Sequence, residues 1–362
     1  MTPKTFLALA GLTAAALIAA VLAVHSRDAG APTDAGAGQP LIPGLARRIN
    51  QITVLVLGGA GQTVTLARSD PESSRWAIVD KAGYPADSDQ VRRAIVALAG
   101  ARTLEPRTAN PGQYARLGLA DDAAIAITLR CADGTDLPGL TLGKTVSGAG
   151  PDRPGSFYAR RTDEPQSWLA EGRLPPLATD PLVWLRRDLP SLSRGQVAAV
   201  TVSRGAGDEI GISRKDPGSA DFAVTGLPRG ARPRQATVND LAGAAEMLGF
   251  EDVGATEPAD ARAAAITTTL RSFEGEVLTI RVVRRDGHPW ASFTIAREGA
   301  AASPEAAERI GESQARHAGW SYRLSEAAAA GLAPSADTLT EPPPAAAGPK
   351  MPDPEARRGG NP

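Results

Sequence analysis

The chain of 362 residues carries the same pattern twice, and this internal repeat limits the fold more than any other feature. In the first copy, the apolar run at residues 52–57 precedes a glycine-rich turn and two short segments with alternating apolar residues, QTVTLAR and RWAIVD. In the second copy, the run at residues 197–203 precedes a similar turn and the segments EIGIS and DFAVTG. Alternation with a period of two is typical of strands that bury one face, so each copy is expected to begin with three strands.

The spacing of two residue pairs sets the expected alignment of the copies. Trp76 and Phe222 lie 222 − 76 = 146 positions apart, and Val54 and Val200 differ by 200 − 54 = 146 positions as well. The turn and the strands around it are therefore expected to repeat without a net gap.

A helix is expected after these strands in each copy, because apolar residues recur at the spacing of one helical face, at Val91, Ala94, Ile95 and Leu98 and at Val238, Leu241, Ala245 and Leu248. Asp87 and Gln90 are spaced as an N-cap residue and its reciprocal partner, and Asp89 would lie in the first turn, where the helix dipole favours negative charge. Thr237 and Asp240 are expected to act similarly in the second copy. No His, Cys or metal ligand accompanies Asp87 and Asp89, so we interpret them as capping groups rather than catalytic acids.

Further matches extend both copies beyond the helix. Residues 124–143 resemble residues 264–283, and each stretch predicts a hairpin that turns at a glycine, Gly134 or Gly275. Leu129 and Leu270 are matched at the same offset, 270 − 129 = 141 positions.

Two later matches are more widely spaced in the second copy than in the first. They pair SFYARR at residues 156–161 with SFTIAR at residues 292–297, and SWLAE at residues 167–171 with SYRLSE at residues 321–326. The difference predicts an Ala-rich helical insertion near residues 300–318, in which Ser303 and Pro304 would begin the helix.

The N-terminal stretch predicts a membrane anchor. Residues 5–24 carry no charge, and 20 helical residues reach about 30 Å, the thickness of the hydrocarbon core of a bilayer. Lys4 precedes the stretch, which favours a cytoplasmic N-terminus and places the bulk of the chain in the periplasm. The alternative is a signal peptide cleaved after Ala23.

Together these features predict an α+β fold with two tandem copies of a mainly antiparallel sheet plus one helix, after a single N-terminal transmembrane helix. The expected limits are an anchor at residues 1–27, a flexible linker at 28–45, a first repeat domain at 46–190, a second repeat domain at 191–333, and a disordered Pro- and Ala-rich tail at 334–362.

Composition and motifs offer little chemistry. The net charge of −1 argues against a nucleic-acid partner, and the single cysteine, Cys131, excludes an intramolecular disulfide. Gly143, Lys144 and Thr145 resemble the end of a phosphate-binding loop, but Pro138 occupies the position of the loop's first glycine. The histidines, His25, His288 and His317, occur singly. We expect no catalytic residue, no cofactor and no metal site.

A family resemblance is carried by WAIVDKAGYPADSDQVRRAIVALAGARTLEPRT, YARLGL, LGK, FYARR and VWLRRDL, in this order after one apolar N-terminal segment. The chain resembles a membrane-anchored family of unknown function whose members are often encoded beside gliding-motility-type ABC transport systems. The resemblance covers residues 52–332 and implies an auxiliary component without ATPase activity, whose partners would be the inner membrane and ABC permease and ATPase subunits. It implies no catalytic residues.

Three functions are therefore weighed. The leading hypothesis is a non-catalytic, periplasmic accessory protein of an ABC-type transport system. The alternative is an envelope ligand-binding protein or enzyme with a site in a cleft between the copies, near Tyr84, Asp87 and Trp184, because duplicated domains place pockets at their interface. A structural spacer is the third.

Overall fold

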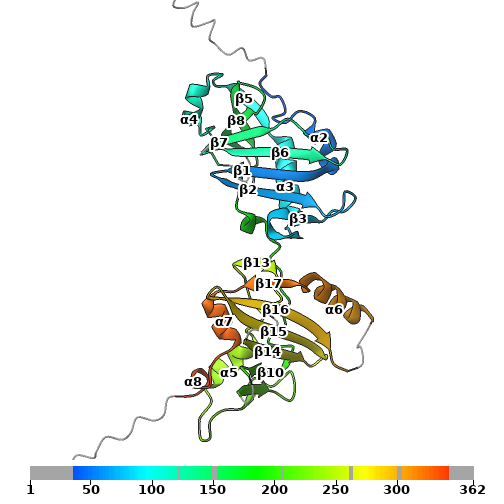
Figure 1. Ribbon diagram of the computed structural model, residues 1–362, viewed down its shortest axis with the longest axis vertical. Coiled ribbons are helices and arrows are strands. Elements are labelled where there is room, and N and C mark those ends of the chain that lie inside the picture. The colour runs from blue at the N-terminus through cyan, green and yellow to red at the C-terminus, as the bar shows by residue number, and fades with distance from the viewer. Residues whose placement is uncertain are drawn as a thin grey trace, which may run out of the picture. The chain divides into compact units, whose positions relative to one another are not determined.

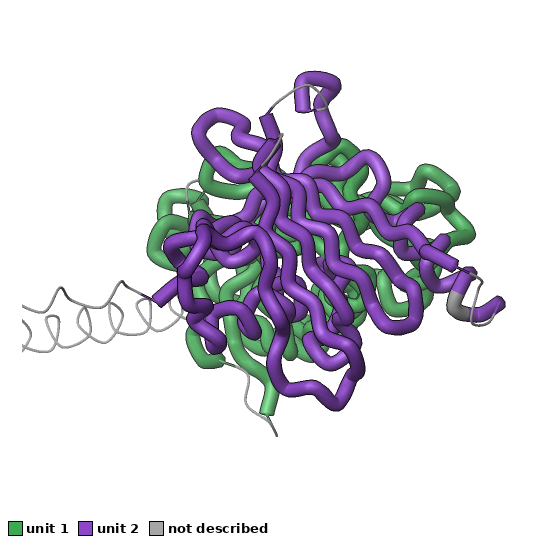
Figure 2. The backbone as a smooth tube through the Cα atoms, turned by 90° about the horizontal axis from the view of Figure 1, so that it is seen from below, with its two compact units in different colours: residues 1–186 green, residues 187–362 purple. Residues whose placement is uncertain are grey.

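The computed structural model describes residues 36–120, 123–148, 153–205, 208–260, 264–299 and 304–341. They fall into two compact units, residues 1–186 and residues 187–362, which Figure 2 shows in separate colours. The boundary lies four residues before the predicted one at 190–191. The predicted transmembrane segment, residues 5–24, lies outside the described residues, and within those residues no helix is both long enough and apolar enough to cross a bilayer.

The first unit is built on a nine-stranded sheet in the order β4-β3-β2-β1-β6-β7-β8-β9-β5, and its neighbouring strands run antiparallel (Figure 1). The strands are β1 (Ile52–Gly59), β2 (Gln62–Arg68), β3 (Trp76–Ile78), β4 (Tyr84–Pro85), β5 (Arg102–Pro106), β6 (Ile125–Cys131), β7 (Leu140–Ser147), β8 (Gly155–Arg161) and β9 (Ser167–Gly172). The helices are α2 (Leu45–Arg48), η1 (Ile49–Gln51), η2 (Val79–Lys81), α3 (Ser88–Gly100), η3 (Pro111–Gln113), α4 (Tyr114–Leu117) and η4 (Pro181–Trp184).

The main helix of this unit, α3, forms as its sequence predicts. The Asp87 carboxylate caps it by accepting hydrogen bonds from the N–H groups of Asp89 and Gln90, at 3.1 and 2.9 Å. The predicted apolar stripe is buried, at Val91, Ala94, Ile95 and Leu98. The reciprocal bond expected from Gln90 is not formed, because the Asp87 N–H donates instead to the carbonyl of Trp184 at 2.8 Å.

The second unit is built on an eight-stranded sheet in the order β12-β11-β10-β14-β15-β16-β17-β13, again with antiparallel neighbours. The strands are β10 (Val197–Ser203), β11 (Glu209–Ser213), β12 (Ala223–Thr225), β13 (Asp252–Ala255), β14 (Ala265–Ser272), β15 (Glu276–Arg285), β16 (His288–Arg297) and β17 (Trp320–Arg323). The helices are α5 (Gln235–Ala242), α6 (Pro304–His317), α7 (Glu326–Leu332) and α8 (Ala336–Leu339).

The two sheets confirm the predicted α+β class with mainly antiparallel pairing. The helical insertion is confirmed as well, since α6 begins at Pro304 and runs beside β16 (Figure 1). The predicted capping by Thr237 is wrong, because α5 begins at Gln235 and places Thr237 inside its first turn.

Strand register corrects the expected alignment at two places. Leu55 faces Leu66, and Val200 faces Ile212 in the corresponding hairpin of the second copy. The residue equivalent to Val200 in the first copy is therefore Leu55 rather than Val54. The first strand is thus offset by 200 − 55 = 145 positions and the second by 212 − 66 = 146, which leaves a one-residue difference in the turn. The periodicity could not detect it, because a single extra turn residue leaves the alternation within each strand unchanged.

The second correction concerns β8 and β16. Ala159 faces Trp168 in the first unit, and Ala291 faces Tyr322 in the second. Leu142 faces both Ile125 and Ala159, and Val282 faces both Ile266 and Ala291 in the second unit. Hence β8 corresponds to β16 at an offset of 291 − 159 = 132, which confirms the match of SWLAE with SYRLSE. SFYARR and SFTIAR, at an offset of 292 − 156 = 136, are out of register. The hairpin glycines match as predicted, because Gly134 and Gly275 have φ of 82° and 83°.

The predicted disordered tail is wrong for residues 334–341. Leu339 is fully buried, Thr340 pairs with Pro233, and the N–H of Glu341 donates to the carbonyl of Arg232 at 2.8 Å. The remainder of the predicted tail, residues 342–362, lies outside the described residues.

Candidate functional site

The structure brings Tyr84, Asp87 and Trp184 together at the edge strand β4 of the first unit. Tyr84 is 2% exposed and donates its hydroxyl to the carbonyl of Arg186 at 3.0 Å. Trp184 is fully buried, and its Nε1 donates to the carbonyl of Ala178 at 2.9 Å. Since the Asp87 carboxylate caps α3, the polar groups of all three side chains are used within the fold.

Backbone contacts explain why these residues meet. Ala86 pairs with Leu185, and the N–H of Arg186 donates to the carbonyl of Pro85 at 3.1 Å. The segment after η4 thereby covers the edge of β4, where unpaired backbone groups would otherwise be exposed. These contacts give the three residues a structural role in the first unit; a ligand site in a cleft between the copies stays a prediction.

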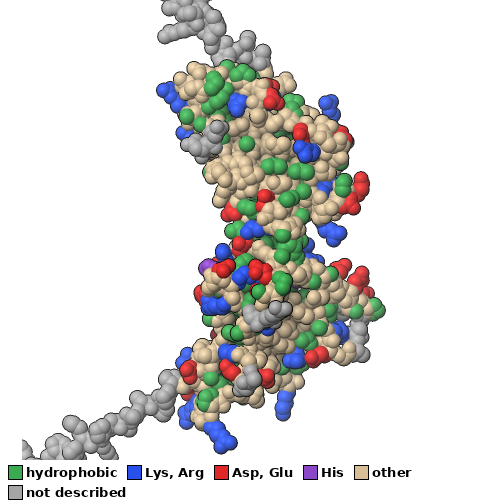
Figure 3. All heavy atoms as spheres, viewed as in Figure 1, with side chains coloured by type: hydrophobic (Ala, Val, Ile, Leu, Met, Phe, Trp, Pro, Cys, Tyr) green, Lys and Arg blue, Asp and Glu red, His purple; other side chains and the backbone are tan. Residues whose placement is uncertain are grey.

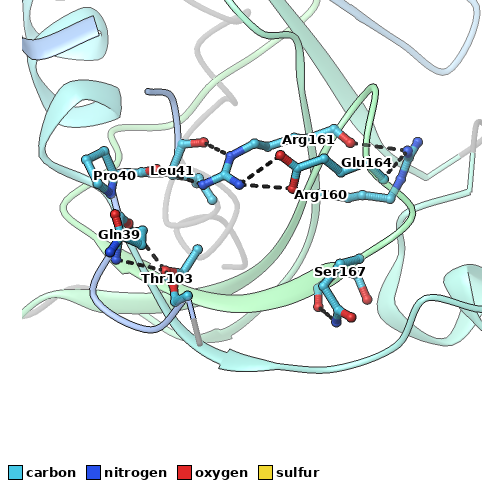
Figure 4. A network of polar contacts seen from close by, with 10 residues as sticks. Gln39, Pro40, Leu41, Thr103, Arg160, Arg161, Glu164 and Ser167 are labelled. Carbon is cyan, nitrogen blue, oxygen red and sulfur yellow. Dashed lines mark hydrogen bonds and ion pairs between the residues drawn. The ribbon is translucent and has the colours of Figure 1, made fainter. Parts of the chain in front are cut away.

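A second polar cluster fixes the segment that follows the predicted anchor. Residues 36–42 lie along the edge strand β5 (Figure 4), where the N–H of Gly38 donates to the carbonyl of Thr103 at 2.6 Å and the N–H of Leu41 donates to that of Ala101 at 3.0 Å. The Thr103 hydroxyl is fully buried, accepts a hydrogen bond from the N–H of Gln39 at 3.1 Å and donates to the carbonyl of Gly36. The segment therefore completes the edge of the sheet.

The Arg161 guanidinium holds the same segment from the adjacent part of the sheet (Figure 4). Its Nε donates to the carbonyl of Leu41 and its Nη2 to that of Pro40, each at 3.0 Å. Its Nη1 contacts both carboxylate oxygens of Glu164, at 2.9 and 3.1 Å. Because the Arg161 side chain is only 14% exposed, these charge-assisted bonds lie in a poorly screened environment.

Burial completes this clamp, which we define as residues 36–45 with Thr103 and Arg161. Leu41 and Leu45 are fully buried and Ile42 is 2% exposed. The prediction of a flexible linker is therefore wrong for residues 36–45, since three large apolar side chains pack into the first unit. Sequence reasoning missed the clamp, although the string LIPGL carried a signal for it.

Among the cavities that the described residues line, three lie within single units. Two occupy equivalent places, at facing residues of matched strands: Ile125 and Leu142 in the first unit, and Ile266 and Val282 in the second. Their volumes are about 330 and 350 Å³. The third cavity, of about 440 Å³, lies in the first unit beside Arg68.

The other residues singled out from the sequence, Lys144, Cys131 and His317, have their polar groups either bonded or buried within the fold. Lys144 lies within β7, so no helix follows it as a phosphate-binding loop requires, and its Nζ donates to the carbonyl of Arg116 at 3.2 Å. Burial raises the pKa of the Cys131 thiol, which favours the neutral form. His317 is buried and lies 2.8 Å from the Tyr322 hydroxyl through its Nδ1. Among the described residues, no group of three or more His, Cys, Asp or Glu side chains is placed to hold a metal ion.

The surface charge is mixed. On the face shown in Figure 3, Lys and Arg side chains lie between Asp and Glu side chains over each unit. Several arginines form ion pairs, such as Arg284 with Glu326 at 2.7 Å and Arg130 with Asp136 at 2.7 Å. These partners lower the pKa of the Glu326 and Asp136 carboxyl groups.

Comparison with known proteins gives one family. No curated protein matches the chain. Residues 76–266 match the family described as Domain of unknown function (DUF4340), and they run from β3 of the first unit to β14 of the second. As the match covers 266 − 76 + 1 = 191 of the 362 residues, the chain belongs to the DUF4340 family.

Proposed function

We propose that this DUF4340 protein is a non-catalytic accessory protein anchored by one segment in the inner membrane, with the bulk of its chain in the periplasm. It serves as an auxiliary component of an ABC-type transport system of the gliding type, and its partners are the permease and ATPase subunits. This proposal joins the apolar residues 5–24 and the family resemblance of the sequence with the geometry of the clamp.

The observation that carries the proposal is the attachment of residues 36–45 to the first unit. Twelve residue steps separate Val24, the last residue of the apolar stretch, from Gly36, where the clamp begins. A fully extended chain covers at most about 3.6 Å per residue, so this tether spans at most about 43 Å. The first unit would then stand within that distance of the bilayer, close enough to contact a membrane-embedded subunit.

The test is affinity purification of the tagged full-length protein from mildly solubilised, crosslinked native membranes, with mass spectrometry of its partners and of its N-terminus. The expected result is recovery of permease and ATPase subunits together with an uncleaved N-terminus. The matched control replaces residues 5–24 with a cleavable signal peptide, and its recovery of these subunits should fall about tenfold, because anchoring raises the effective concentration near the membrane.

Two results would count against the proposal. One is repeated recovery of the full-length protein without any transporter subunit. The other is equal recovery of the subunits by the unanchored control, which would remove the need for the tether.

The alternative, a ligand-binding protein of the envelope, draws support from the three cavities. The two functions are compatible, and the same control separates them. Without the anchor, recovery of the transporter subunits should fall, whereas ligand binding in the cavities should persist, because the cavities remain intact.

A further inference from the structure

The two units carry the same arginine beside the same aromatic position. Arg68 is the last residue of β2 and lies 5.6 Å from the ring centre of Trp76. Arg214 follows β11 and lies 4.8 Å from the ring centre of Phe222. Arg214 is 214 − 68 = 146 positions after Arg68, the offset that also separates Phe222 from Trp76. The duplication thus provides an internal comparison for one guanidinium group.

In the second unit, all three nitrogens of this guanidinium donate hydrogen bonds to backbone carbonyls. The Nε of Arg214 donates to the carbonyl of Val197 at 2.9 Å, and its Nη2 donates to those of Arg194 and Gly195 at 2.8 and 2.7 Å. Its Nη1 donates to two more carbonyls, those of Pro217 and Ser219. Arg214 therefore has a structural role that uses all three of its nitrogens.

A second ring also encloses Arg214. The ring centre of Phe273 lies 5.4 Å from the guanidinium carbon. The N–H of Phe273 donates to the carbonyl of Gln196, and in the first unit the N–H of Ala132 donates in the same way to Gln51. Ala132 is thus the counterpart of Phe273, and a methyl group replaces the second ring.

In the first unit, the corresponding guanidinium lacks most of these bonds. Within the described part of the chain, Arg68 donates one hydrogen bond, from Nη1 to the carbonyl of Pro71 at 3.1 Å, and its Nε is buried without a partner. The counterparts of Arg194 and Gly195 are Ile49 and Asn50, at an offset of 145 positions. They belong to the short helix η1, in which the carbonyl of Ile49 accepts a hydrogen bond from the N–H of Ile52. The Ile49 carbonyl is therefore used within η1, and among the described residues no hydrogen bond joins Arg68 to Ile49 or Asn50.

A cavity of about 440 Å³ opens where the saturating contacts are missing. We call it the Arg68 cavity, and it is lined by Ile49, Asn50, Arg68, Glu72, Ser74, Trp76, Arg92, Ile95 and Val96. Its volume lies within the range of small-molecule sites, about 300–1,000 Å³. Ile95 and Val96 contribute an apolar wall from α3, and Val96 is 49% exposed although it is a large apolar side chain.

The charged side chains that line the cavity indicate the charge of a ligand that would fit it. Arg68 and Arg92 contribute two positive charges and Glu72 contributes one negative charge, which leaves a net charge of +1. Among the described residues, the one ion pair of Arg92 is a long contact of 3.7 Å to Asp89, and the Arg92 side chain is 60% exposed, so it is able to turn to a ligand. A planar guanidinium group matches a carboxylate with two parallel hydrogen bonds. A single negative charge balances this lining, whereas a phosphate dianion would exceed it.

We propose that the Arg68 cavity binds a monocarboxylate that carries an apolar substituent, with the carboxylate on Arg68 and Arg92 and the substituent against Trp76, Ile95 and Val96. The ligand is a small organic acid or the C-terminal carboxylate of a peptide, which share this chemistry. The site goes beyond the accessory function, because it requires neither the anchor nor a transporter subunit.

The test is calorimetric titration of the detergent-solubilised full-length protein with N-acetylleucine and with a tripeptide that ends in a free leucine. Saturable binding of either is expected, with at least tenfold weaker binding of the matching amides, which lack the charge. Tighter binding of the tripeptide identifies a peptide terminus as the source, and equal or tighter binding of the acid identifies a small molecule. Equal binding of the amides, or no saturable binding of either acid, overturns the proposal.

Three variants assign the binding to the cavity. Arg68→Met keeps the aliphatic stem and removes the guanidinium, so affinity should fall about tenfold, and Arg92→Met, at an exposed position that the fold does not need, should lower it about threefold. The matched control is Arg214→Met, which removes the counterpart in the other unit and should leave affinity unchanged. Wild-type affinity in both Arg68→Met and Arg92→Met, or binding of inorganic phosphate as tight as that of N-acetylleucine, contradicts the proposal.

Discussion

Replacement of Leu41 by alanine tests whether residues 36–45 belong to the first unit. Leu41 is fully buried, and the change removes three carbon groups from the core. At about 0.8 kcal/mol for each group, the lost transfer free energy is about 2.4 kcal/mol, and the cavity left behind raises the expected loss of stability to about 3 kcal/mol. In a flexible linker, the same change would cost less than about 0.5 kcal/mol.

Hydrogen exchange measured by mass spectrometry locates this effect. In the wild-type protein, the amides of Gly38 and Leu41 should exchange slowly, because both donate to carbonyls next to or within β5. A loss of about 3 kcal/mol should speed their exchange by about 100-fold, since each 1.4 kcal/mol corresponds to a factor of ten. The control is Val79→Ala, at a position 52% exposed, which should leave these rates unchanged.

The melting temperature gives a second measure of the same change. For a unit of about 150 residues, a loss of about 3 kcal/mol should lower it by about 6–12 °C. Arg161→Met should act in the same direction, because it leaves the carbonyls of Pro40 and Leu41 without their donor. Unprotected amides at residues 36–45 in the wild-type protein would refute the clamp.

Three further changes test the local surroundings of single residues. Asp87→Ala should lower the stability of the first unit by about 1 kcal/mol through loss of the α3 cap, whereas Asp89→Ala should change it by less than about 0.5 kcal/mol; equal effects in urea unfolding would contradict the capping role. Gly143→Ala should destabilise the protein, since its Cβ would lie 2.3 Å from a backbone carbonyl oxygen, while Gly100→Ala, which meets open space in α3, should stabilise it by up to about 1 kcal/mol in the same assay. Burial raises the pKa of the Glu276 carboxyl group in the folded state, so its ionised form disfavours folding. The free energy of unfolding should therefore fall as the pH rises from the unfolded-state pKa through the folded-state pKa. Glu276→Gln should therefore raise the melting temperature at pH 7 and lose this advantage in acid; an equal gain at every pH would refute the assignment.

Local patterns in the sequence predicted much of the fold. The cap at Asp87 and the stripe from Val91 to Leu98 depend only on neighbours along one helix, and they are confirmed. The hairpin glycines, Gly134 and Gly275, were likewise visible because a tight turn needs a positive φ. Such features arise from interactions within about ten residues of each other.

Contacts between residues far apart in the sequence were harder to predict. The clamp depends on Arg161, which lies 120 positions after Leu41, and the composition around it resembles a linker. The Arg68 cavity depends on the absence of contacts that Arg214 makes in the other copy, a difference that the matched residue types conceal. The capping role of Asp87 was predicted from its neighbours. Its backbone hydrogen bond to Trp184 joins residues 97 positions apart, so local patterns could not predict it.

The most direct test of the central claim, a membrane-anchored protein with its units outside the cytoplasm, is thiol labelling of Val79→Cys in intact cells. Val79 is 52% exposed, whereas the native cysteine, Cys131, is 1% exposed, so the introduced thiol is the accessible one within the described chain. We expect a reagent that crosses the outer membrane but not the inner membrane to label Val79→Cys without lysis, on a protein that stays in the membrane fraction after alkaline extraction. Labelling only after the inner membrane is broken, or release of the labelled protein by extraction, would contradict the claim.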